Sequence, residues 1–197
     1  MICSLNLTAM EETFTHVRTM ISIILGFGIA QLLKNAVKLI DHNKGVKPYP
    51  LHLMWVFYTF LLIIHFWWWE ARLTGVGSWN FLEYVFLIFY TTMYFALSVL
   101  IFPDSISDYK GYKDYFFSRK QWFFSFLIVI FVADFADTLL KGKQYFQSLH
   151  WEYPVRNLAH IVLCLLGMRI NNARFQYILA LLFILYEISY ILRHYFF

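Results

Sequence analysis

The chain of 197 residues is too apolar for a soluble domain of its size, with 60% hydrophobic residues and only 14% charged residues. The formal net charge of +4 would suggest nucleic-acid binding in a soluble protein. Here the basic residues lie in loops beside apolar segments, where membrane topology explains them. We therefore expect a protein embedded in the lipid bilayer that binds no nucleic acid.

Six segments are long and apolar enough to cross a bilayer, which takes about 20 residues in a helix. In chain order they are residues 17–40, 51–69, 80–102, 121–140, 154–170 and 173–195. Proline and glycine separate most of them, and the last two are joined only by Asn171 and Asn172, which predicts a tight hairpin. The sequence thus predicts an all-α polytopic membrane protein, a bundle of about six transmembrane helices forming one domain over residues 1–197.

An even number of spans puts both termini on one side of the membrane. The loops on the opposite side hold most of the basic residues, which are Lys34, Lys38, Lys44, Lys47, Lys110, Lys113, Arg119, Lys120, Arg169 and Arg174. Because cytoplasmic loops are enriched in Lys and Arg, we expect that side to be cytoplasmic. Both termini then face outward, in a multi-pass protein of the cell inner (plasma) membrane.

The first three spans carry small, charged and hydroxyl residues in distinct places. Gly26 and Gly28 open a notch in the first span that suits close helix packing. The second span ends in a string from His65 to Glu70, with Glu70 and Arg72 at its outer mouth. The third begins near Glu83 and then presents Tyr90 and Tyr94 on the same helical stripe. Such a line of hydroxyls is typical of a proton or cation path, and equally of ordinary packing.

The connector from Asp104 to Lys120 alternates aromatic and charged residues. Its aromatic residues recur at helical spacing, so we expect a segment lying on the inner membrane surface. Lys110, Lys113, Arg119 and Lys120 would then lie near lipid phosphates or dock a soluble cytoplasmic protein.

The last three spans bring ionisable residues to the outer half of the bilayer. Asp134 and Asp137 share one face of the fourth span, Arg156 and His160 one face of the fifth, and Glu187 lies in the sixth. Ionisable groups in hydrocarbon are costly and usually mark function. The structural alternative is that Asp137 pairs with Lys141, and Asp134 with Arg156.

These residues favour a channel or transporter for protons or small cations, as a homo-oligomer. The ion would bind to or move along Glu83, Asp134, Asp137 and Glu187, with His65 and His160 exchanging protons and Arg156 tuning the charge. A second hypothesis is a sensor or effector subunit that recruits a soluble partner through its inner loops. A third is a redox protein in which His65 and His160 bind b-type haem or a metal ion. We expect no other cofactor, and no motif of soluble-enzyme chemistry is present.

Overall fold

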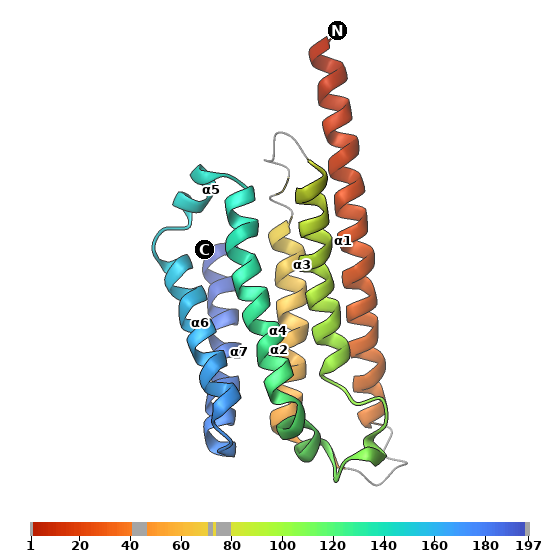
Figure 1. Cartoon of the computed structure of the whole chain (residues 1–197), viewed down its shortest axis with the longest axis vertical. Helices are drawn as coiled ribbons and strands as arrows, with labels where there is room; N and C mark the ends of the chain where they lie inside the picture. Colours follow the sequence, from red (N-terminus) through yellow and green to blue (C-terminus); the bar gives the residue numbers. More distant parts are fainter. Residues whose placement is uncertain (1, 41–46, 71–72, 74–79, 196–197) are drawn as a thin grey trace.

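The computed structural model describes residues 2–40, 47–70, 73 and 80–195, without the side chains of residues 2–13 and 40. This part of the chain is helical and contains no strand (Figure 1). The helices are α1 (Ile2–Ile40), α2 (Pro50–Trp69), α3 (Phe81–Leu100), α4 (Tyr112–Leu140), α5 (Lys143–Ser148), α6 (Glu152–Arg169) and α7 (Ala173–Tyr195), with a 3-10 turn at Ile106–Asp108. All six predicted spans coincide with long helices, so the expected all-α bundle is confirmed.

Five of these helices are long and apolar enough to cross a membrane, namely α1, α2, α3, α4 and α7. The predicted fifth span, α6, is more polar because it contains Arg156, Asn157 and His160. Its outward residues Val155 and Leu158 are apolar and more than half exposed, at 51% and 57%. The polar face of α6 therefore points into the bundle, and its outer face resembles that of the other five helices.

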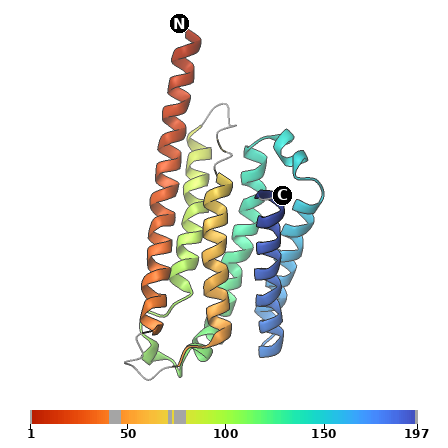
Figure 2. The same ribbon diagram turned by 180° about the vertical axis from the view of Figure 1, so that it is seen from behind.

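The six long helices run alternately up and down, so both termini lie toward the same end of the bundle (Figures 1 and 2). We call this the terminal end. Helix α1 packs mainly on α3, α4 packs on α6 and α3, and α2 contacts α1, α3, α4 and α7. Helices α6 and α7 follow each other through a three-residue connection, but each packs more closely on another helix, α6 on α4 and α7 on α2.

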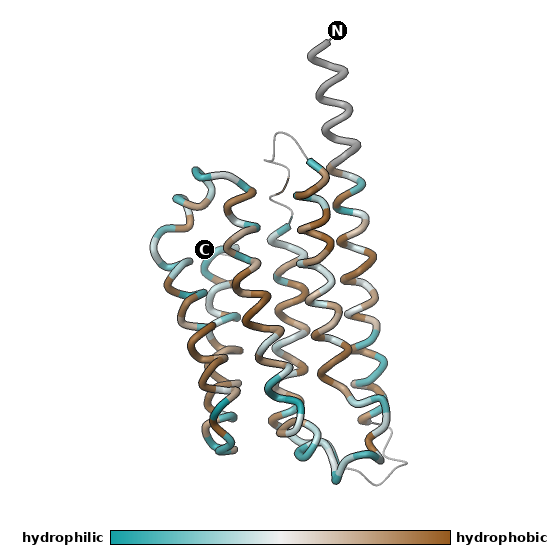
Figure 3. Tube along the Cα trace, viewed as in Figure 1, coloured by the Kyte–Doolittle hydropathy of each residue, from teal (hydrophilic) through white to brown (hydrophobic). Residues whose placement is uncertain are grey.

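Apolar residues fill the middle length of the bundle, and hydrophilic residues gather toward its ends (Figure 3). Away from the terminal end the core is aromatic. Trp55 lies within 5.2–5.7 Å, between ring centroids, of Tyr58, Phe123, Phe124 and Phe183. Trp55, Tyr58 and Phe124 have no exposed surface. We call these five side chains the aromatic layer.

Helix α4 begins at Tyr112, nine residues before the predicted start of the fourth span at residue 121. Residues 112–120 of the expected surface connector therefore belong to α4, and for this part the expectation of a separate surface segment was wrong. Of the helically spaced aromatic residues of the connector, Phe116 is 5% exposed because it packs into the bundle, and Tyr109 and Tyr112 are half-buried. Gly111, with φ of 135°, makes the turn into α4 in a conformation that side chains disfavour.

Candidate functional site

The predicted ionisable residues mostly meet in the interior near the terminal end. They come from four helices that surround the same space: α2 gives His65 and Glu70, α4 gives Asp134 and Asp137, α6 gives Arg156, and α7 gives Glu187. Glu70, Asp134, Asp137 and Glu187 are each at most 8% exposed. Buried charges at such positions require partners, because uncompensated burial is costly.

Lys141 joins two of the carboxylates. Its Nζ lies 2.5 Å from Asp137 Oδ2 and 2.9 Å from Glu70 Oε1. Asp137 precedes Lys141 by one helical turn, and Glu70 reaches them from the end of α2. The second oxygens, Glu70 Oε2 and Asp137 Oδ1, are buried without a hydrogen-bond partner. The predicted pairing of Asp137 with Lys141 is confirmed, and this trio has one carboxylate in excess.

Asp134 is surrounded by hydrogen-bond donors. Its Oδ2 lies 2.6 Å from Asn157 Nδ2, 2.8 Å from the Tyr153 hydroxyl and 3.5 Å from Arg156 Nη2. Its Oδ1 accepts a hydrogen bond of 3.2 Å from the Tyr90 hydroxyl. The predicted Asp134–Arg156 pair is thus confirmed. Four donors therefore satisfy the hydrogen-bonding capacity of this buried carboxylate.

Tyr90 and Tyr94 lie together in the core, as their shared stripe predicts. Their hydroxyl oxygens are 3.1 Å apart, and neither side chain is more than 4% exposed. Together with the Tyr90–Asp134 hydrogen bond they extend the polar network inward from Asp134. Phe66 stacks on Tyr94 with ring centroids 4.2 Å apart, which fixes the position of this ring.

Glu187 and His65 form a second buried pair. His65 Nδ1 is hydrogen-bonded to Glu187 Oε1, and His65 Nε2 lies 3.3 Å from the Tyr195 hydroxyl. Glu187 is 3% exposed, so it is an interior group and does not extend to the membrane surface. Arg156 lies over the ring of Tyr190, with Cζ 4.4 Å from the ring centroid. His160 is held by a 2.7 Å hydrogen bond to the Arg156 carbonyl oxygen.

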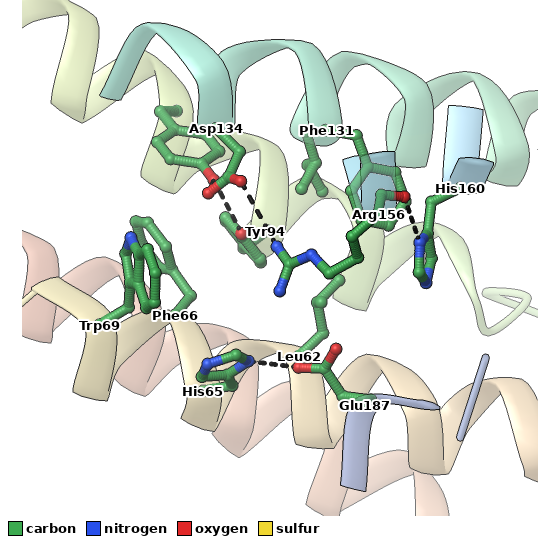
Figure 4. A pocket seen from close by; sticks show the side chains of 12 residues that line it. Leu62, His65, Phe66, Trp69, Tyr94, Phe131, Asp134, Arg156, His160 and Glu187 are labelled. Atoms are coloured by element: carbon green, nitrogen blue, oxygen red, sulfur yellow. Dashed lines mark hydrogen bonds and ion pairs between the residues drawn. The ribbon is translucent and has the colours of Figure 1, made fainter. Parts of the chain in front are cut away.

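A cavity of about 30 Å³ lies between these groups (Figure 4). We call it the central cavity. Its polar lining consists of His65, Tyr90, Tyr94, Asp134, Arg156, His160 and Glu187. A second cavity of about 70 Å³ adjoins Glu70 and is lined by Arg18, Ile21, Trp67, Trp68 and Leu73. Arg72, the other residue predicted at the mouth, lies outside the described residues.

Glu83 does not join the predicted relay. Its carboxylate accepts a 3.0 Å hydrogen bond from the Asn80 backbone amide, while Asn80 Oδ1 accepts one of 2.9 Å from the Glu83 amide. This reciprocal capping box satisfies the free amides at the start of α3. The structure therefore gives Glu83 a local structural role.

Lys120 was predicted to lie at the surface, and this prediction was wrong. It is 2% exposed, and its Nζ donates hydrogen bonds of 2.7–3.1 Å to the carbonyl oxygens of Gly167, Met168 and Ile170. These are carbonyl groups at the C-terminal end of α6, where a positive charge is favourable. Lys120 thus ties α4 to the end of α6.

The other three basic residues of the connector, Lys110, Lys113 and Arg119, are exposed. Three exposed acidic residues accompany them, namely Asp104, Asp108 and Asp114. Arg119 also donates a hydrogen bond of 3.1 Å to the Tyr109 hydroxyl. The segment therefore has balanced charge and offers no concentrated basic surface to lipid phosphates or to an acidic partner.

The residues do not fit the haem or metal hypothesis. His65 and His160 do line the same cavity, but its volume of about 30 Å³ is far too small for a macrocycle. His65 has both ring nitrogens engaged, with Glu187 and Tyr195. Within the described ranges, no group of three or more His, Cys, Asp or Glu side chains is arranged to hold a metal ion.

Sequence reasoning missed two residues of the network, Tyr153 and Asn157. Both contact Asp134, and both are fully buried. With His160 they have the spacing i, i+4 and i+7, which places them on one face of α6. That polar stripe was the available signal.

Comparison with protein families, with curated proteins and with solved structures finds no match to this chain.

Proposed function

We propose that this chain is an integral protein of the inner membrane that binds protons reversibly from its terminal side and relays them into the bundle. The supporting observation is the trio of Glu70, Asp137 and Lys141. Two buried carboxylates share one ammonium group, and each keeps one oxygen without a partner. A buried net negative charge is costly, and one added proton removes it.

The trio has a path to its surroundings and another toward the interior. The cavity of about 70 Å³ beside Glu70 offers room for water at the mouth. On the inner side, Asp134 lies one turn from Asp137 on the same face of α4, next to Tyr90 and Tyr94. Asp134 is the better compensated carboxylate, so we assign proton uptake to the trio and relay to the Asp134 network.

The aromatic layer argues against a permanently open pore for hydrated cations. It begins ten residues before His65 along α2, which is about 15 Å deeper in the bundle. Its rings contact one another from α2, α4 and α7, so they fill the interior at this level of the bundle. Proton movement past this layer then requires a second conformation of the bundle, as in a transporter that opens alternately to the two sides.

Proton flux into liposomes tests the proposal. Purified wild-type protein, reconstituted with a pH-sensitive dye inside the vesicles, is expected to carry protons down an imposed pH gradient. Asp137→Asn and Glu70→Gln each leave one carboxylate for one ammonium group, so no excess charge remains to attract a proton. Each is expected to reduce the flux to the level of protein-free liposomes.

Asp114→Asn is the matched control. It makes the same chemical change in the same helix, at an exposed position at the opposite end of the bundle. Its flux is expected to equal that of the wild type. A wild-type protein without flux, or undiminished flux in both trio variants, would contradict the proposal.

A further inference from the structure

Besides the trio, two buried polar networks lie in this half of the bundle, and among the described residues no direct hydrogen bond joins one to the other. One contains Asp134 with Arg156 and the two tyrosines of α3, and the other is the His65–Glu187 pair. Both line the central cavity, from opposite sides (Figure 4). A relay that uses both networks needs something in the cavity to connect them.

Arg156 supplies a free donor at this place. Its Nη2 lies 3.5 Å from Asp134, whereas its Nη1 is buried without any hydrogen-bond partner. The side chain is only 10% exposed. Figure 4 shows its guanidinium group projecting between Asp134 on one side and the His65–Glu187 pair on the other. An unpaired buried guanidinium donor costs free energy, which a bound acceptor recovers.

The dimensions of the cavity decide which acceptor it takes. A site needs about 10–15 Å³ of such volume to hold one water molecule, so about 30 Å³ accommodates about two. No larger ligand fits. The lining offers a cationic donor, carboxylate acceptors and tyrosine hydroxyls, which are the two to four polar partners that an internal water requires.

We propose that the central cavity binds about two ordered water molecules, which accept a hydrogen bond from Arg156 Nη1 and link the Asp134 network to the His65–Glu187 pair. This inference rests on the proposed function and specifies its relay. A water molecule that accepts a proton from one network releases another to the second, so it is left unchanged. Arg156 is then a positioning residue, which holds the water through a group that is not itself deprotonated.

Hydroxyl-radical labelling detects such water. Ionising radiation converts bound water into radicals that modify the adjacent side chains, which mass spectrometry then identifies. Leu62 and Phe66 line the central cavity, whereas Leu127 and Phe124 are also buried but line none of the cavities described above. Modification is expected to be several-fold faster at Leu62 than at Leu127, and at Phe66 than at Phe124.

A pair of variants identifies the source of the radicals. Ile130 lines the cavity, and Ile130→Phe fills it. Ile63→Phe makes the same change at a buried position outside the lining. Only the first is expected to slow modification at Leu62 to the rate at Leu127, with retained helicity confirmed by circular dichroism.

Equal rates at Leu62 and Leu127 in the wild type would overturn the inference without needing any variant. A fast rate at Leu62 that persists in a folded Ile130→Phe protein would also overturn it. Labelling and flux are separate measurements. Flux without labelling contradicts the water alone, and labelling without flux contradicts the proton-relay function alone.

Discussion

Lys141 is the single positive charge for two buried carboxylates, and its side chain is 1% exposed. Removing one partner of a buried ion pair leaves an uncompensated charge, which is more damaging than never having had the pair. The variant Lys141→Met keeps most of the length of the side chain and removes the charge. We expect it to lower the free energy of unfolding by about 3–5 kcal/mol, measured by denaturation in detergent micelles.

The triple variant Lys141→Met, Glu70→Gln, Asp137→Asn is the control for this prediction. It removes all three charges, so it is expected to recover most of the lost stability. If Lys141→Met had the same free energy of unfolding as the wild type, the charge of Lys141 would not stabilise the two carboxylates.

Two ion pairs of the site were predictable from the spacing of residues along one helix and from the depth of residues in neighbouring spans. Asp137 and Lys141 are one turn apart in a helix, and Asp134 and Arg156 lie at matched depths in neighbouring spans. Glu70 was expected at the mouth, but its contact with Lys141 depends on how α2 packs beside α4, which the sequence does not encode locally. Glu83 was predicted as a relay group because intramembrane acids favour function, but its position three residues after Asn80 makes it a cap.

At the scale of helices, Lys120 fixes the register between α4 and α6. The Lys120 ammonium group donates hydrogen bonds to three carbonyl groups at the end of α6. The Gln176 side-chain amide donates to only two of these carbonyl groups, those of Gly167 and Ile170. Lys120→Met leaves the Met168 carbonyl without this donor. We expect a loss of about 1–3 kcal/mol in the free energy of unfolding.

Lys113→Met serves as the comparison for Lys120→Met, since Lys113 is exposed in the first turn of the same helix. Thermal denaturation in the same detergent is expected to show a change within about 0.5 kcal/mol for this variant. Equal effects of the two substitutions would mean that Lys120 contributes no more than a surface lysine.

Two glycines in helices are expected to respond oppositely to alanine. A Cβ on Gly167 would lie 2.7 Å from Phe124 and 2.9 Å from Leu179, whereas a Cβ on Gly26 would meet nothing within 4 Å. Gly167→Ala should cost about 1–3 kcal/mol of stability through overpacking. Gly26→Ala should be neutral or stabilise by about 1 kcal/mol or less. Thermal denaturation of both in one detergent checks the pair, and a stabilised Gly167→Ala would contradict it.

Helix boundaries were least predictable at the starts of α1 and α4, which begin at Ile2 and Tyr112 where residues 17 and 121 were expected. The first turns of α4 carry polar residues at exposed positions, so a hydropathy criterion excludes them, although Gly111 precedes the helix. The small-residue notch expected in α1 packs closely against a neighbouring helix at only one of its two glycines. A Cβ on Gly28 would lie 3.3 Å from Ser98, so α1 and α3 approach closely at Gly28 and not at Gly26.

For the whole molecule, the number of crossings determines the orientation of the termini. Five crossings would place the termini on opposite sides of the membrane, and six place them together. The arrangement of the bundle and the apolar outer face of α6 support six. We expect reporter proteins fused separately to the N- and C-terminus to indicate the same compartment, and the excess of basic residues on the other side predicts the outside. Reporters in different compartments would show that α6 does not cross.

The polar face of α6 also has a consequence for how the protein is assembled in the membrane. Arg156, Asn157 and His160 lie within a helix of only 18 residues, so its apolar content alone gives little tendency to partition into lipid. The carboxylate that compensates these groups belongs to α4, and α7 helps to enclose them. We therefore expect α6 to enter the bilayer together with α4 and α7, so that the second half of the chain inserts as one unit.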